Sequence, residues 1–93
     1  MTKAIIYKDD KSQVAFCEDG RIYFKSENSR FYIEAKEILK SLDAIKTKGI
    51  TERKELLNKL ISMNYQEAAK FHLENQKSKG RKGKLFEGEY NDK

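Results

Sequence analysis

Two five-residue segments constrain the fold of this chain most: residues 21–25 (RIYFK) and residues 30–34 (RFYIE). Each is a run of aromatic and β-branched side chains with a charge at both ends, which is typical of a half-buried strand. The polar residues 26–29 lie between them, and four residues are a common length for a hairpin connection. The pattern therefore predicts the central hairpin of a small antiparallel sheet.

Two more strands are expected before this hairpin, at residues 3–8 and 13–18, with a turn at residues 9–12. Asp19-Gly20 is the strongest short hairpin signal in the chain. If these two residues form a two-residue turn, Glu18 lies opposite Arg21 and Phe16 lies opposite Tyr23.

That register assigns the apolar side chains to the two faces of the sheet. One face would carry Val14, Phe16 and Tyr23, and the other would carry Ala15, Cys17, Ile22 and Phe24. Both faces are partly apolar, and helices can cover only one of them. The other face is then either a binding surface or covered by a partner, for which a second copy of the chain is one candidate.

Residues 30–34 fit two patterns. Phe31, Ile33 and Ala35 alternate as in a strand, whereas Phe31, Ala35 and Ile38 also repeat at helical spacing, so that the helix could begin near Ser29. We favour a strand through Glu34, because the Tyr-Ile run prefers a sheet.

Three helices are expected from residue 35 onward. The first carries an apolar stripe from Ala35 to Ile45, with Lys46 and Lys48 near its end and Gly49 as its cap. The second begins at Thr51 as N-cap and runs to about residue 62. The third begins with a capping box of Asn64 and Glu67 and runs to about Gln76.

The 93 residues suit one domain with one core. The predicted fold class is α+β: an antiparallel meander of three or four strands, followed by two or three helices packed on one face. Residues 1–76 form this domain, and residues 77–93 form a basic, flexible tail. Leu85 and Phe86 in that tail either dock on the domain or contact something else.

The positive charge is concentrated near the end of the chain. Residues 1–34 are balanced, whereas residues 77–93 hold six Lys or Arg and three Asp or Glu. A local basic excess favours a polyanion or an acidic protein as partner, and phosphate contacts would give salt-sensitive affinity for nucleic acid. The predicted nucleic-acid-binding residues are Lys77, Lys79, Arg81, Lys82 and Lys84, with Lys25 and Arg30 in second place.

The sheet offers a second route to nucleic acid, because it could present Tyr7, Tyr23 or Tyr32. Lys8 and Arg21 would flank these rings together with Lys25 and Arg30. Aromatic rings bordered by cations hold single strands by stacking. The alternative is that these rings belong to the core and the cations only keep the surface soluble.

Catalytic chemistry is hard to assemble from this sequence. His72, the only histidine, falls on the apolar arc of the third helix, and Cys17 is expected in mid-strand without a group that would lower its pKa. Asp9-Asp10 and Glu18-Asp19 lie in predicted turns. No ligand spacing for a metal and no phosphate-binding loop is present. We expect a protein that is not an enzyme and uses neither metal nor cofactor.

The cellular setting is expected to be the cytoplasm of a cell. A single cysteine forms no internal disulfide, and no apolar run has the length of a membrane span or the character of a signal peptide. The partner is then nucleic acid, a nucleoprotein complex or a bacterial host protein, and no membrane is involved.

Two resemblances are short or general. Residues 64–70 (NYQEAAK) resemble the first helix of excisionase-type DNA-binding domains, but the turn and recognition helix of that motif do not follow. The lysine-rich, proline-free composition resembles that of accessory proteins from phages and mobile elements. This resemblance implies the alternative function: an anti-CRISPR-like inhibitor of a host defence or nucleic-acid-processing protein that acts by protein–protein contact.

Overall fold

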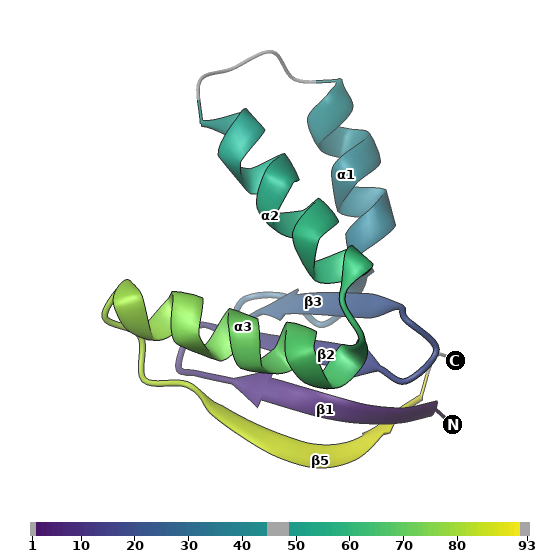
Figure 1. Cartoon of the computed structure of the whole chain (residues 1–93), viewed down its shortest axis with the longest axis vertical. Helices are drawn as coiled ribbons and strands as arrows, with labels where there is room; N and C mark the ends of the chain where they lie inside the picture. The colour runs from purple at the N-terminus through teal and green to yellow at the C-terminus, as the bar shows by residue number, and fades with distance from the viewer. Residues whose placement is uncertain (1, 45–48, 92–93) are drawn as a thin grey trace.

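In the part of the chain that is described, the fold consists of one antiparallel sheet with three helices on one of its faces (Figure 1). It was obtained as a computed structural model, which describes residues 2–44 and 49–91. The strands lie in the order β4-β3-β2-β1-β5. The elements are β1 (Thr2–Lys8), β2 (Ser12–Cys17), β3 (Ile22–Ser26), β4 (Ile33–Glu34), α1 (Ala35–Asp43), α2 (Ile50–Ser62), α3 (Tyr65–Ser78) and β5 (Lys84–Tyr90). The predicted α+β class is confirmed, with five strands in place of three or four.

Strand β5 is the main departure from the predicted order of elements. It pairs with β1 along the whole length of that strand, from Thr2 opposite Tyr90 to Lys8 opposite Lys84. Residues 84–90 therefore form an edge strand, where the sequence predicted a flexible tail from residue 77 onward. The backbone N–H and C=O groups on one side of β1 form hydrogen bonds with β2. Those on the other side form hydrogen bonds with β5, which lies far away in the sequence.

The β2–β3 hairpin has a different register from the one that the sequence suggested. Phe16 lies opposite Ile22 and Ala15 lies opposite Tyr23. The connection has three residues, because the Cys17 N–H donates to the Arg21 carbonyl oxygen at 2.9 Å and Gly20 takes a φ of 94°. A three-residue loop with a left-handed glycine is a known alternative to the two-residue turn. The predicted assignment of side chains to faces was therefore wrong for β3, since a shift of one residue reverses every side chain.

The segment from residue 30 onward is mostly loop, and the strand is short. Only Ile33 and Glu34 pair with β3, opposite Phe24 and Tyr23, and α1 begins immediately after them. The strand predicted through Glu34 is thus present only in its last two residues. The predictions for Ile45, Lys46 and Lys48 lie outside the described residues.

Caps define the beginnings of the other two helices. Helix α2 starts at Ile50, and its N-cap is Gly49, which has a φ of 89°. The predicted N-cap at Thr51 was therefore two residues late. Helix α3 has the predicted cap: the Asn64 side-chain oxygen accepts the Glu67 N–H at 2.8 Å. It runs two residues beyond the predicted end at Gln76.

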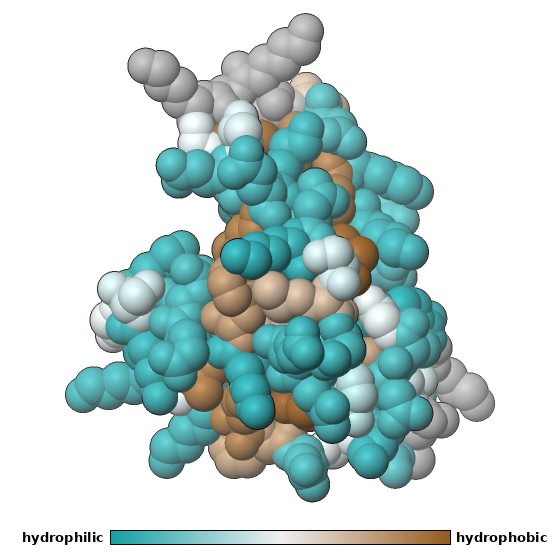
Figure 2. Space-filling model, viewed as in Figure 1, coloured by the Kyte–Doolittle hydropathy of each residue, from teal (hydrophilic) through white to brown (hydrophobic). Residues whose placement is uncertain are grey.

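The main core lies between the sheet and the helices. Its fully buried side chains include Tyr7, Val14 and Phe16 from the sheet and Leu60 from α2. Helix α3 lies along β1 and β2, while α1 and α2 form an antiparallel pair that extends away from the sheet (Figure 1). Figure 2 shows the apolar surface gathered at the centre of this view, along the junction between helices and sheet, with hydrophilic surface around it.

The other face of the sheet is partly closed by the chain itself. The small residues Ala4, Ala15 and Cys17 are buried there together with Tyr23. The Tyr90 ring stacks on the Tyr23 ring with 4.1 Å between centroids, and Tyr32 meets Tyr90 edge-on at 5.2 Å. We call this side of the sheet the open face, because the described helices all lie on the opposite side (Figure 1).

Gly83 allows the connection between α3 and β5 to lie directly against the core. A Cβ at this position would overlap the ring of Tyr7, which is fully buried and packs edge-on against His72. We expect Gly83→Ala to lower the free energy of unfolding by about 1–3 kcal/mol, as over-packing does, measured by urea denaturation.

Gly88→Ala provides the matched control for this substitution. Gly88 lies in β5, the strand that Gly83 precedes, and a Cβ there would come no closer than 3.8 Å to Ile6. The free energy of unfolding should change by less than about 0.5 kcal/mol. Equal effects of the two substitutions would contradict the proposed packing.

His72 should make the fold sensitive to mild acid. Both ring nitrogens are buried without a hydrogen-bond partner, and burial lowers the pKa of His72 to about 4, with Asp9 opposing and Lys79 adding to the shift. Because the unfolded chain takes up this proton near pH 6.5, the free energy of unfolding should fall by roughly 3 kcal/mol between pH 6.5 and pH 4. In His72→Leu, urea denaturation at pH 7 and pH 4.5 should show most of this fall removed. A fall of the same size in the variant would contradict the assignment.

Candidate nucleic-acid interface

Three lysines form a transverse row on the open face. Lys25 of β3 lies opposite Gln13 of β2, Gln13 lies opposite Lys8 of β1, and Lys8 lies opposite Lys84 of β5. Residues directly opposite each other in antiparallel strands point to the same face. We call Lys8, Gln13, Lys25 and Lys84 the lysine row. It spans three strand spacings, or about 14 Å.

The structure separates the cations that the sequence placed in one tail. Lys77 lies in the last turn of α3, with its Nζ 4.0 Å from Glu74, and Lys79 is the C-cap residue of that helix. Lys82 is exposed in the connection to β5, and Lys84 begins β5. These four residues and Arg81 therefore belong to a helix end, a connection and a strand.

The two second-place candidates also lie apart. Lys25 is half-buried in the lysine row, with its Nζ 5.7 Å from the ring centroid of Tyr32. Arg30 is exposed in the loop between β3 and β4. Of the seven predicted residues, Lys25 and Lys84 thus come together in the row, and Lys8 completes it.

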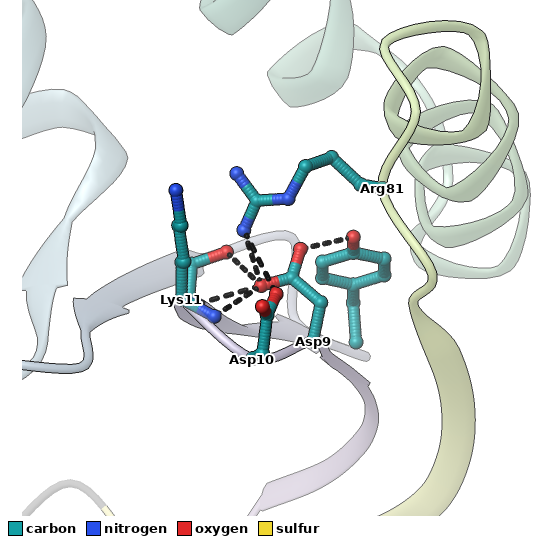
Figure 3. Close-up of polar contacts among 6 residues, drawn as sticks. Asp9, Asp10, Lys11 and Arg81 are labelled. Carbon is teal, nitrogen blue, oxygen red and sulfur yellow. Dashed lines mark hydrogen bonds and ion pairs between the residues drawn. The ribbon is translucent and has the colours of Figure 1, made fainter.

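Arg81 has a structural partner. Its Nη2 donates to Asp9 Oδ1 at 2.7 Å and lies 3.7 Å from Asp10 Oδ1 (Figure 3). The Asp9 side chain has no exposed surface, whereas that of Asp10 is 82% exposed. The pair links the β1–β2 turn to the α3–β5 connection. Much of the charge of Arg81 is therefore compensated within the fold.

Asp9 collects hydrogen bonds from its own turn as well. Its Oδ1 accepts the N–H groups of Lys11 and Ser12, both at 2.8 Å, and its Oδ2 accepts the Tyr7 hydroxyl. Burial raises the pKa of Asp9, but these bonds and Arg81 outweigh burial and lower the pKa to about 2. Burial and the neighbouring Asp9 raise the pKa of Tyr7 to about 12. At neutral pH the carboxylate is charged and the phenol is protonated.

A polar cleft of about 250 Å³ adjoins the lysine row. Its lining includes Lys8, Gln13 and Lys25, together with Ser12, Ser26 and Ser29. Asp10 and Glu27 also line it, while Asp9 on its wall is neutralised by Arg81. The two lysines of the lining are matched by Asp10 and Glu27, so the cleft places hydroxyl and amide groups beside the lysine row without adding net positive charge.

The aromatic residues named from the sequence are mostly used in packing. Tyr7 points into the main core, and Tyr23 is buried under Tyr90. Tyr32 retains partial exposure beside Lys25. Phe86, which the sequence analysis did not assign to the interface, is half exposed on the open face. Phe86 lies two residues after Lys84 in the sequence. This spacing places both side chains on one face only if residues 84–90 form a strand, which the sequence did not predict.

The surroundings of His72 do not form a polar site. His72 borders an apolar cavity of about 110 Å³, whose other lining residues are aliphatic, Phe24 and Arg53. Within residues 2–44 and 49–91, no group of three or more His, Cys, Asp or Glu side chains could hold a metal ion. No helix in these ranges has the length and apolar character needed to cross a membrane. Residues 64–70 are the N-cap and the first six residues of α3, which packs on the sheet through Ala69 and His72.

Comparisons of the chain with protein-family models, with curated proteins and with solved structures found no match.

Arg81→Gln should weaken the fold, because it removes the charged partner of a buried carboxylate. We expect the free energy of unfolding at pH 7 to fall by about 1–3 kcal/mol, since Tyr7 and two N–H groups still solvate Asp9. With Arg81 present, the Asp9 pKa of about 2 adds stability above pH 3.8 that is lost as the pH falls toward 2. In Arg81→Gln the free energy of unfolding should fall less over this acid range, because the pKa of Asp9 in the variant lies closer to 3.8.

Lys82→Gln is the control for the loss of one positive charge in the same connection. Lys82 is exposed and lies next to Arg81 in the chain. Its replacement should change the free energy of unfolding by less than about 0.5 kcal/mol in urea denaturation. If Arg81→Gln behaved like Lys82→Gln, the structural role of Arg81 would be refuted.

Proposed function

We propose that this chain is a non-catalytic binding protein that engages nucleic acid, or a complex that contains nucleic acid, through the lysine row. The observation that carries the proposal is the alignment of Lys8, Lys25 and Lys84 from three different strands on the open face. Three ammonium groups over about 14 Å can contact successive phosphates of one backbone.

The local balance of charge supports this proposal. Lys11 and Lys82 border a depression beside the row, so five lysines surround this end of the sheet. Against these five lysines, the acidic residues of the cleft lining are Asp10, Glu27 and Asp9, and the charge of Asp9 is compensated by Arg81. A local positive excess attracts a polyanion and accelerates its association. The predicted contacts outside the lysine row also include Lys77 and Lys79 at the end of α3 and Arg30 in the loop before β4.

A second candidate function is inhibition of a host protein by direct contact. Phe31 is 77% exposed and Ile33 is 51% exposed, next to the two-residue edge strand β4. Large apolar side chains that are exposed close together in the chain are candidates for a protein-binding surface. Such a complex would persist after nuclease treatment, whereas an association held by nucleic acid would be lost.

Simultaneous replacement of Lys8, Lys25 and Lys84 by Gln tests the leading proposal. We expect binding of labelled DNA or RNA in a mobility-shift titration to weaken by at least tenfold at low salt. The slope of log K against log salt should also fall by about 2–3, since each phosphate contact contributes roughly 0.7–0.9.

The matched control replaces Lys36, Lys40 and Lys70 by Gln. These lysines are exposed on α1 and α3, and the change in net charge is the same. Affinity should change by less than about threefold, the size of a general charge effect. The proposal fails if the wild-type chain binds neither DNA nor RNA at low salt, or if both triple variants weaken binding equally.

A further inference from the structure

Phe86 occupies a position on the open face that folding alone does not require. Its ring is 50% exposed, although it belongs to a regular strand and lies opposite Ile6. It lies two residues after Lys84 in β5, so both side chains point to the same face. The next residue on that face is Gly88. Along β5, the phenyl ring therefore has a lysine of the row on one side and a glycine on the other.

The space beside Phe86 suits a flat group. A Cβ at Gly88 would meet only Ile6, at 3.8 Å, and nothing else within 4 Å. Aromatic side chains next to a cationic track bind unpaired bases by stacking, while the cations hold the backbone. On the helix side of β5, by contrast, Leu85 packs against the main core.

The shape of the open face favours one strand over two. The described helices lie on the opposite side of the sheet, so none of them projects from the open face where it could enter the groove of a duplex (Figure 1). In a duplex the bases are stacked on one another and do not reach a phenyl ring on a flat surface. An unpaired base can leave its own stack and lie on Phe86.

We infer that the nucleic acid engaged by this chain is single-stranded, with its phosphates along the lysine row and an unpaired base stacked on Phe86. This inference rests on the proposed function. It specifies the class of nucleic acid and adds Phe86 as a contact residue that makes no charge interaction.

Fluorescence anisotropy with labelled DNA and RNA single strands of about 12 nucleotides, and with DNA and RNA duplexes of the same length, tests the inference. The wild-type chain should bind a single strand more tightly than the corresponding duplex. Phe86→Ala should weaken binding to the single strand by about tenfold or more and leave the salt slope unchanged, since no phosphate contact is lost. Phe86→Tyr, which retains an aromatic ring, should stay within about threefold of the wild type.

Phe31→Ala is the matched control, because Phe31 is the more exposed phenylalanine and lies in the loop before β4. It should leave the affinity for single strands within about twofold. The inference is overturned if Phe86→Ala has no effect, or if it weakens single-strand and duplex binding equally.

The triple variant of Lys8, Lys25 and Lys84 distinguishes a failure of this inference from a failure of the proposed function. If the replacement of Lys8, Lys25 and Lys84 abolishes binding while Phe86→Ala does not, only the single-strand inference fails. If the wild-type chain binds no nucleic acid in any of these measurements, both fail.

Discussion

The structure depends on one buried carboxylate. Asp9 is fully enclosed and charged, and it receives donors from Tyr7 in β1, from the two N–H groups of its own turn and from Arg81 in the α3–β5 connection. An ion enclosed in this way is tolerated only when its hydrogen bonds are made, and the loss of one partner is costly. The contact therefore holds the beginning and the end of the chain together. It places β5 beside β1 and brings Gly83 against the Tyr7 ring.

Because of this contact, the cations of residues 77–84 have different roles. Arg81 compensates Asp9 and belongs to the fold, whereas Lys84 is carried by β5 to the open face, where it lies opposite Lys8. A charge count over residues 77–84 cannot distinguish these cases, because it weights each residue equally. The proposed interface is for this reason a surface built from three strands, and no flexible tether is needed for it. Its polar cleft and its exposed phenylalanine are properties of the assembled sheet.

Local rules predicted much of the secondary structure. The Asn64 cap, the amphipathic stripe from Ala35 and the first three strands each follow from a few neighbouring residues, and each is present. The hairpin at Asp19-Gly20 was recognised, but its loop has three residues and not two, which moved Tyr23 to the opposite face. A two-residue type I′ turn would need a positive φ at Asp19 as well as at Gly20, and only Gly20 has one. Either register buries apolar groups on both faces. Packing of Ile22 and Phe24 with the helix-side core selects between them.

The sequence alone was sufficient for the α+β class, for the start of α3 at its Asn64 cap, and for naming Lys25 and Lys84 as candidate contacts. These depend on interactions within a few residues, or on charge that is present in any conformation. Only the tertiary structure established β5, the lysine row and the pairing of Arg81 with Asp9. Backbone hydrogen bonds between strands are the same for almost any side chain. The side-chain contacts that favour β1 as the neighbour of β5, such as Arg81 with Asp9 and Tyr90 with Tyr23, join residues far apart in the sequence and exist only in the folded chain.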